Sequence, residues 1–183
     1  MAVNELNRLA DVLREEGLDV FELGGWHERG HGEFGEPWGV ICHHSDSLSA
    51  NPEYIAEGRP DLQGPLSHIH LAQDGTMTVV AQGTAWHAGR GQYAGLPTNK
   101  ANAHTFGIHA VSDGKQPYPD VQYETYVRCC AAIVCKIGQP ASHVIGHKEW
   151  NAEKWDPTLD MDKFGAGVDA LLGAASSADA ARG

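Results

Sequence analysis

The sequence predicts an α/β fold, in which helices flank a mixed central β-sheet. Three observations lead to this prediction. The run Gly39-Val-Ile-Cys-His43 is short, apolar and β-branched, which is typical of a buried central strand. Residues 67–81 alternate in polarity on both sides of Asp74-Gly75, which is the pattern of a β-hairpin. Two segments with apolar residues at helical spacing follow these strands in the second half of the chain.

The first half of the chain opens with an amphipathic helix over residues 4–16, which Gly17 ends. Residues 24–37 are too rich in glycine for a helix, so we expect a loop that leads into the first strand. A short helix is expected near residues 52–57, between this strand and the hairpin.

The second half continues with a Gly-rich loop at residues 83–100 and a strand over residues 105–111. Asp120 then caps a long amphipathic helix that ends at Gly138. Residues 143–147 form a further strand, which runs into a polar loop.

A last helix carries apolar residues at helical spacing from Met161 to Leu172. Residues 173–183 are rich in alanine and serine and lack apolar periodicity, so we expect a linker-like tail. The sequence therefore predicts one domain over residues 1–172, within which residues 1–38 form an N-terminal extension of helix and Gly-rich loop.

Composition limits the partners and the compartment. The net charge is −11 with 13 lysines and arginines, which argues against a nucleic-acid partner because phosphates would meet no basic stripe. No secretory signal and no stretch long enough to cross a membrane are found. Four cysteines occur without a CxxC pair, and we expect them to be small buried hydrophobes in a reducing compartment. They are Cys42, Cys129, Cys130 and Cys135.

Eleven histidines are many for 183 residues, and two of them end predicted strands. His43 ends the first apolar strand and His147 ends the last one, where rigid backbone aims side chains at a common point. Asp156 follows nine residues after His147. Two histidines and one carboxylate give zinc three protein ligands and leave a fourth position for water. Spacing alone leaves open that each histidine is an ordinary hydrogen-bonded residue.

Five motifs resemble those of a known family. GVICHHS, HIHLAQDGT, WHAGRG, residues 102–111 and GHKEWNAEKWDP stand in the order found in N-acetylmuramoyl-L-alanine amidases, whose fold is shared with peptidoglycan recognition proteins. The resemblance covers residues 39–172. The opening, with its helix, Trp26 and the RGHGEFG loop, is similar to the amidase domains of actinobacteriophage endolysins.

The resemblance implies zinc-dependent hydrolysis of the amide bond between N-acetylmuramic acid and L-alanine in peptidoglycan. It implies that Lys154 stabilises the negative oxygen formed in this reaction, and that His87 and Asn102 line the substrate groove. The family's zinc ligands fall on His43, His147 and Asp156.

Two positions depart from the family pattern. The strand that usually reads Gly-Ile-Glu here reads Gly107-Ile108-His109, and Ser67 stands where other relatives have a tyrosine. From this position we expect Ser67 to contact substrate, together with His87 and Asn102. We expect His109 to substitute as the general base, because an imidazole accepts protons near neutral pH. The alternatives are that His109 only orders water or packs the groove, or that it marks an inactivated site. His68 and His70 alternate onto one face of the hairpin and could also point into the groove.

The expected role is that of a phage-endolysin-type lytic enzyme. A non-cutting peptidoglycan-binding module and a bacterial muropeptide-recycling amidase are the alternatives. The expected partners are the glycan strand and stem peptide of peptidoglycan, and a monomer is expected. The resemblance implies synthesis in the host cytoplasm, with action on the wall after release.

Overall fold

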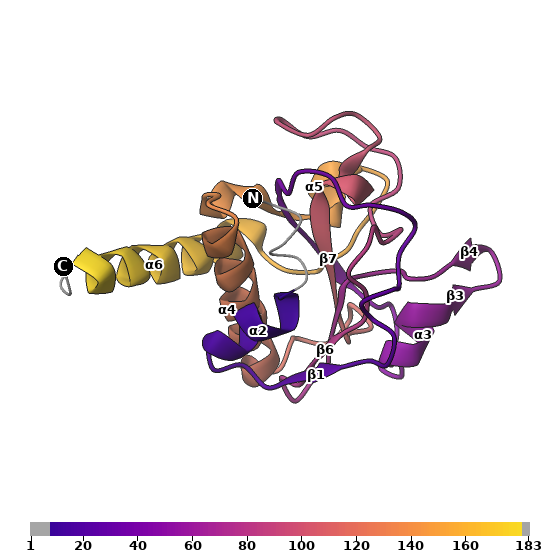
Figure 1. The fold of residues 1–183 in the computed structure, drawn as a ribbon, viewed down its shortest axis with the longest axis horizontal. Coiled ribbons are helices and arrows are strands. Elements are labelled where there is room, and N and C mark those ends of the chain that lie inside the picture. Colours follow the sequence, from indigo (N-terminus) through magenta and orange to yellow (C-terminus); the bar gives the residue numbers. More distant parts are fainter. Residues whose placement is uncertain (1–7, 181–183) are drawn as a thin grey trace.

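A six-stranded mixed sheet forms the centre of the computed structural model, which describes residues 8–180 (Figure 1). Only β5 and β6 pair antiparallel within it, and the other neighbours run parallel. In spatial order its strands are β1 (Val20–Glu22), β6 (Met77–Val79), β5 (Ile69–Leu71), β7 (Thr105–Ala110), β2 (Gly39–His44) and β8 (Val144–Gly146). This arrangement confirms the predicted α/β fold with a mixed sheet.

Helices gather on opposite sides of this sheet. Figure 1 shows α2 (Leu9–Glu15), α4 (Asp120–Lys136) and the start of α6 (Met161–Ala180) together on one side. On the other side lie α3 (Pro52–Glu57) and a small antiparallel pair, β3 (Gly58–Arg59) and β4 (Leu62–Gln63). Three short helices complete the chain: η1 (Ala101–Ala103), η2 (Ala141–His143) and α5 (His147–Trp150).

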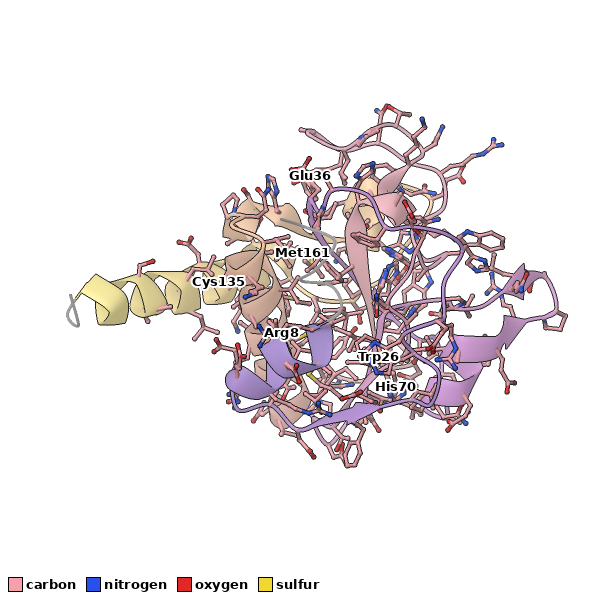
Figure 2. The ribbon with its side chains drawn as sticks, viewed as in Figure 1. Arg8, Trp26, Glu36, His70, Cys135 and Met161 are labelled. Atoms are coloured by element: carbon pink, nitrogen blue, oxygen red, sulfur yellow. The ribbon has the colours of Figure 1, made fainter. Side chains whose placement is uncertain are left out.

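Side chains alternate between the two faces of the sheet, because successive residues of a strand point in opposite directions. We call the α4 side the core face: it buries residues such as Cys42 and Ile108, which are register partners in β2 and β7. The opposite side, the site face, carries His43 and His109, which are also register partners, and His70 of β5 pairs with His109 in turn (Figure 2 labels His70). One row of three neighbouring strands therefore presents three histidines.

Several local predictions are confirmed. The hairpin turns at Gly75, whose φ of 88° suits the left-handed region that glycine tolerates. The predicted helix at residues 52–57 is α3, which Asn51 caps by accepting the Tyr54 N–H. Gly17 and Gly138 follow the ends of α2 and α4. Residues 4–7 of the predicted first helix lie outside the described residues.

Other predictions need correction. The edge strand β1 was not predicted, because three residues are too few to show alternation. Asp120 is the first residue of α4 and not its cap, which is Pro119. Cys135 is exposed on α4, unlike the three buried cysteines (Figure 2). Residues 173–180 continue α6 as helix and do not form an irregular tail.

Within residues 8–180, no helix has the length and apolar character needed to cross a membrane.

Candidate metal centre

Three predicted ligands converge at the carboxyl ends of β2 and β8. The Nδ1 atoms of His43 and His147 lie 3.1 Å apart, and Asp156 Oδ2 lies 3.0 Å from His43 Nδ1 and 3.2 Å from His147 Nδ1. All three residues are buried, with exposed fractions of 1%, 6% and 8%. In the described part of the chain they form the group of histidine and carboxylate side chains that could hold a metal ion.

Local structure explains why these residues meet. Cys42 and Gly146 are register partners in the parallel pair β2–β8, so the histidines that follow them emerge at the same edge of the sheet. Lys148 returns the later loop to this edge: its N–H donates to the Asp156 carbonyl at 2.8 Å, and its Nζ donates to the Leu159 carbonyl at 2.6 Å. These two bonds bring the side chain of Asp156, nine residues after His147, against the His147 ring.

The donor set fits a divalent cation. Two imidazole nitrogens and a carboxylate oxygen, all electron-rich, face one another, which is stable only with a cation among them, either a proton or a metal ion. Burial, followed by the nearby His147, lowers the pKa of His43 to about 4, so its ring is neutral near pH 7. Burial opposes ionisation of Asp156, but hydrogen bonds with His147 and His43 outweigh it and hold the pKa of Asp156 below its usual value.

The spacing of this set is compatible with zinc. In a tetrahedral zinc site with nitrogen or oxygen ligands near 2.1 Å, neighbouring ligand atoms lie about 3.4 Å apart. The observed separations of 3.0 to 3.2 Å are close to this spacing. Two histidines and one carboxylate also leave a fourth position open, as in catalytic zinc sites.

His109 lies directly beside the metal set. Its ring stacks on that of His43, with centroids 4.7 Å apart and planes 26° from parallel. Its Nδ1 is buried and has no hydrogen-bond partner among residues 8–180. Burial, followed by the nearby His43, lowers the pKa of His109 well below 6.5, so the ring is neutral near pH 7.

Lys154 is exposed on the loop that carries Asp156, two residues before it. Trp155 stands between them in the chain and is 52% exposed. It packs edge-on against the ring of His44, with ring centroids 4.4 Å apart. Trp155 was not predicted as a site residue, although a large aromatic residue next to a predicted ligand is visible in the sequence.

The three residues predicted to contact substrate also make contacts within the protein. Ser67 is fully buried, and its hydroxyl is 2.5 Å from the Gly107 carbonyl oxygen. His87 is 7% exposed, with both ring nitrogens at hydrogen-bonding distance from protein atoms. The amide oxygen of Asn102 accepts two backbone N–H groups. His68, left open in the sequence analysis, is also fully buried.

Tyr126 lies on the buried face of α4, and its hydroxyl reaches the backbone of the site. It accepts the backbone N–H of His43 at 2.9 Å and lies 3.0 Å from the Ile108 carbonyl. The hydroxyl thus fixes the backbone of a predicted ligand from the core face. A tyrosine within a buried helix face needs such a polar partner, which was the available signal.

The chain is similar to known proteins in sequence and in fold. The family model described as N-acetylmuramoyl-L-alanine amidase matches residues 33–159. The 1,6-anhydro-N-acetylmuramyl-L-alanine amidase AmpD of Citrobacter freundii is 27% identical over 134 residues, covering 72% of this chain and 70% of that protein.

Solved structures agree in fold. A mutant endolysin from Bacillus subtilis superposes with a TM-score of 0.60 at 17% identity, over 82% of this chain and 99% of that one. The amidase AmiD from E. coli, solved with the substrate anhydro-N-acetylmuramic acid-L-Ala-D-gamma-Glu-L-Lys, gives 0.61 at 14% identity, over 75% and 59%. At these identities the likeness concerns the fold. The family match, which spans more than half of the sequence, shows that this chain belongs to the N-acetylmuramoyl-L-alanine amidase family.

Proposed function

We propose that this amidase is zinc-dependent and cleaves the bond between N-acetylmuramic acid and L-alanine in bacterial peptidoglycan. The observation that carries the proposal is the buried convergence of His43, His147 and Asp156, whose ligand atoms lie at the spacing of a tetrahedral site. A module that only binds peptidoglycan has no need of this set, so its presence favours hydrolysis.

The metal would be held by these three residues and would supply a Lewis acid that polarises the scissile carbonyl and activates water. Asp156 reduces the net positive charge of the site. Lys154, on the exposed end of the same loop, carries a flexible ammonium group that can approach the substrate oxygen as negative charge develops there.

His109 is the proposed general base. It lies beside His43 on the site face, and burial keeps its ring neutral and able to accept a proton from the attacking water. Its ring forms no hydrogen bond with another residue in the part of the chain that the structure describes. His109 can therefore exchange a proton without breaking a contact that supports the fold.

Purified sacculi test the proposal. Incubation with the zinc-loaded protein should release new L-alanine amino termini, and prior treatment with a chelator should abolish the release until zinc is restored. If no such termini form at any zinc concentration, with either intact wall or soluble fragments, the proposed reaction is wrong.

A second candidate role is the recycling of soluble muropeptides, which the likeness to AmpD favours. The fold is compatible with both roles, since it matches an endolysin over 99% of that chain and an AmpD structure over 93% of that one. We propose the endolysin-type role on the resemblance of the opening helix, Trp26 and the RGHGEFG loop to phage lysins. In this role the protein would act as a monomer on the wall after release from the host cytoplasm. The two roles are distinguished by the rates of cleavage of sacculi and of an anhydro-muropeptide, supplied with equal amounts of the scissile bond. A recycling enzyme should prefer the soluble substrate.

A further inference from the structure

Both histidine ligands of the proposed metal site are held from behind by one two-residue segment, His87-Ala88. His43 Nε2 lies 3.0 Å from Nδ1 of His87, and His147 Nε2 lies 3.0 Å from the carbonyl oxygen of Ala88. In each ligand the other ring nitrogen, Nδ1, faces Asp156. The segment therefore contacts both histidines on the side opposite the metal position.

These contacts determine where the ring protons lie. A carbonyl oxygen can only accept, so Nε2 of His147 carries the proton that it donates to Ala88, and Nδ1 is the nitrogen that faces Asp156 and is left to share a proton with it or to bind a metal in place of that proton. His87 places the ring proton of His43 on Nε2 in the same way. Its Nε2 lies 3.0 Å from the Thr105 carbonyl and must donate, so its Nδ1 accepts a proton from His43 Nε2. Nδ1 of His43 is then also free to bind a metal.

The segment itself is fixed by two further features. The amide oxygen of Asn102 accepts the N–H of His87 at 3.0 Å and the N–H of Ala88 at 2.7 Å. Gly107 leaves room for the imidazole of His87 on the sheet, since a Cβ there would lie 2.6 Å from His87 Cγ. Asn102 thus holds the backbone of the segment, and β7, which carries Gly107, lies against the His87 ring.

We propose that His87, Ala88 and Asn102 are positioning residues that fix both histidine ligands in the Nε2–H tautomer, and that His87 and Asn102 do not act as substrate contacts. This inference rests on the proposed zinc site. Partners that hold the outer nitrogen of a metal-bound histidine typically contribute a factor of 10–100 in metal affinity.

Zinc affinity, measured by competition with a chromogenic chelator, tests the proposal directly. His87→Leu removes the acceptor for His43 at similar volume and should weaken zinc binding about 10–100-fold. His87→Asn places an amide oxygen near the former Nδ1 position and should bind zinc within about threefold of the native protein, since the acceptor is kept. Asn102→Ala should weaken binding, and Asn102→Asp, which keeps the oxygen, should recover most of it.

Histidine tautomers in the metal-free native protein give a readout that does not depend on any variant folding. A long-range proton–nitrogen spectrum at pH 8 should show Nε2 protonated in both His43 and His147, whether or not one Nδ1 also carries the proton that faces Asp156. A ring that carries its proton on Nδ1 alone would overturn the inference, and so would unchanged zinc affinity in His87→Leu. If the native protein itself fails to bind zinc, the proposed function is wrong. The tautomer measurement tests the positioning role separately, because it needs no zinc.

Discussion

The two faces of the central sheet are built from the same strands but serve different purposes. On the core face, residues such as Ile108 and Leu71 are fully buried in an apolar cluster against α4. On the site face, the alternate positions of the same strands carry His109 and His70. Because side chains alternate between the faces, one residue of a strand supports the core and the next belongs to the site. Substituting one should therefore change stability, and substituting its neighbour should change activity.

The largest expected effect on the site face follows from removing a ligand. Asp156→Ala should abolish stoichiometric zinc retention and lower activity by about a thousandfold or more, because the metal supplies several kcal/mol of transition-state stabilisation. Metal analysis after gel filtration, together with the sacculus assay, checks this. The matched control is Asp169→Ala, which removes an exposed carboxylate on α6 and should change neither quantity. A variant at position 156 that still bound one zinc would refute the ligand set.

Changing the proton-transfer group should separate chemistry from metal binding on the same face. His109→Ala should lower activity about 10²–10⁴-fold, the usual contribution of a general base, while zinc content is retained. His109→Glu restores a carboxylate and should recover part of the loss. Full activity of His109→Ala between pH 6 and 8 would rule out this role.

A substitution of the neighbouring residue, Ile108, should instead lower stability and leave zinc binding unchanged. Ile108→Ala empties a fully buried position on the core face and should lower the free energy of unfolding by about 2–5 kcal/mol. Zinc content per folded molecule should stay unchanged below the melting transition. Urea unfolding measures the loss, with the exposed Leu171→Ala on α6 expected to stay within about 0.5 kcal/mol. Loss of zinc from folded Ile108→Ala would show that the faces are not separable.

The smallest expected effect concerns pH. Burial lowers the pKa of His68, on the site face, to about 3. The unfolded chain binds this proton near pH 6.5 and the folded chain does not, so stability should fall as the pH drops below about 6.5, by about 1.4 kcal/mol per pH unit for this residue. His68→Asn keeps an acceptor for the Gly107 N–H, now held at 2.9 Å. The variant should reduce the slope of metal-free stability between pH 6 and 4 by that amount; an unchanged slope would contradict the assignment.

The sequence was sufficient for five of the six strands of the sheet and for the convergence of His43, His147 and Asp156, because alternation and strand-end histidines are visible in the local order of residues. It was insufficient for the contacts of His87, since the bonds from its segment to Asn102 join a loop to η1, and this packing leaves no periodic pattern in the sequence. Residues 173–180 were misjudged for another reason. Their lack of apolar spacing suggested a linker, although alanine is the strongest helix former and extends α6 through Ala174 and Ala175, which are exposed.

The close approach of His87 to Gly107 means that the two positions share one volume. The imidazole occupies space that a side chain on the neighbouring strand would otherwise fill, so substitutions at either position should be judged in pairs. Gly107→Ala alone would have to displace the ring, whereas the same change combined with a smaller residue at 87 would fit sterically and still lose the acceptor for His43. In redesign of this amidase, the two positions are best treated as one.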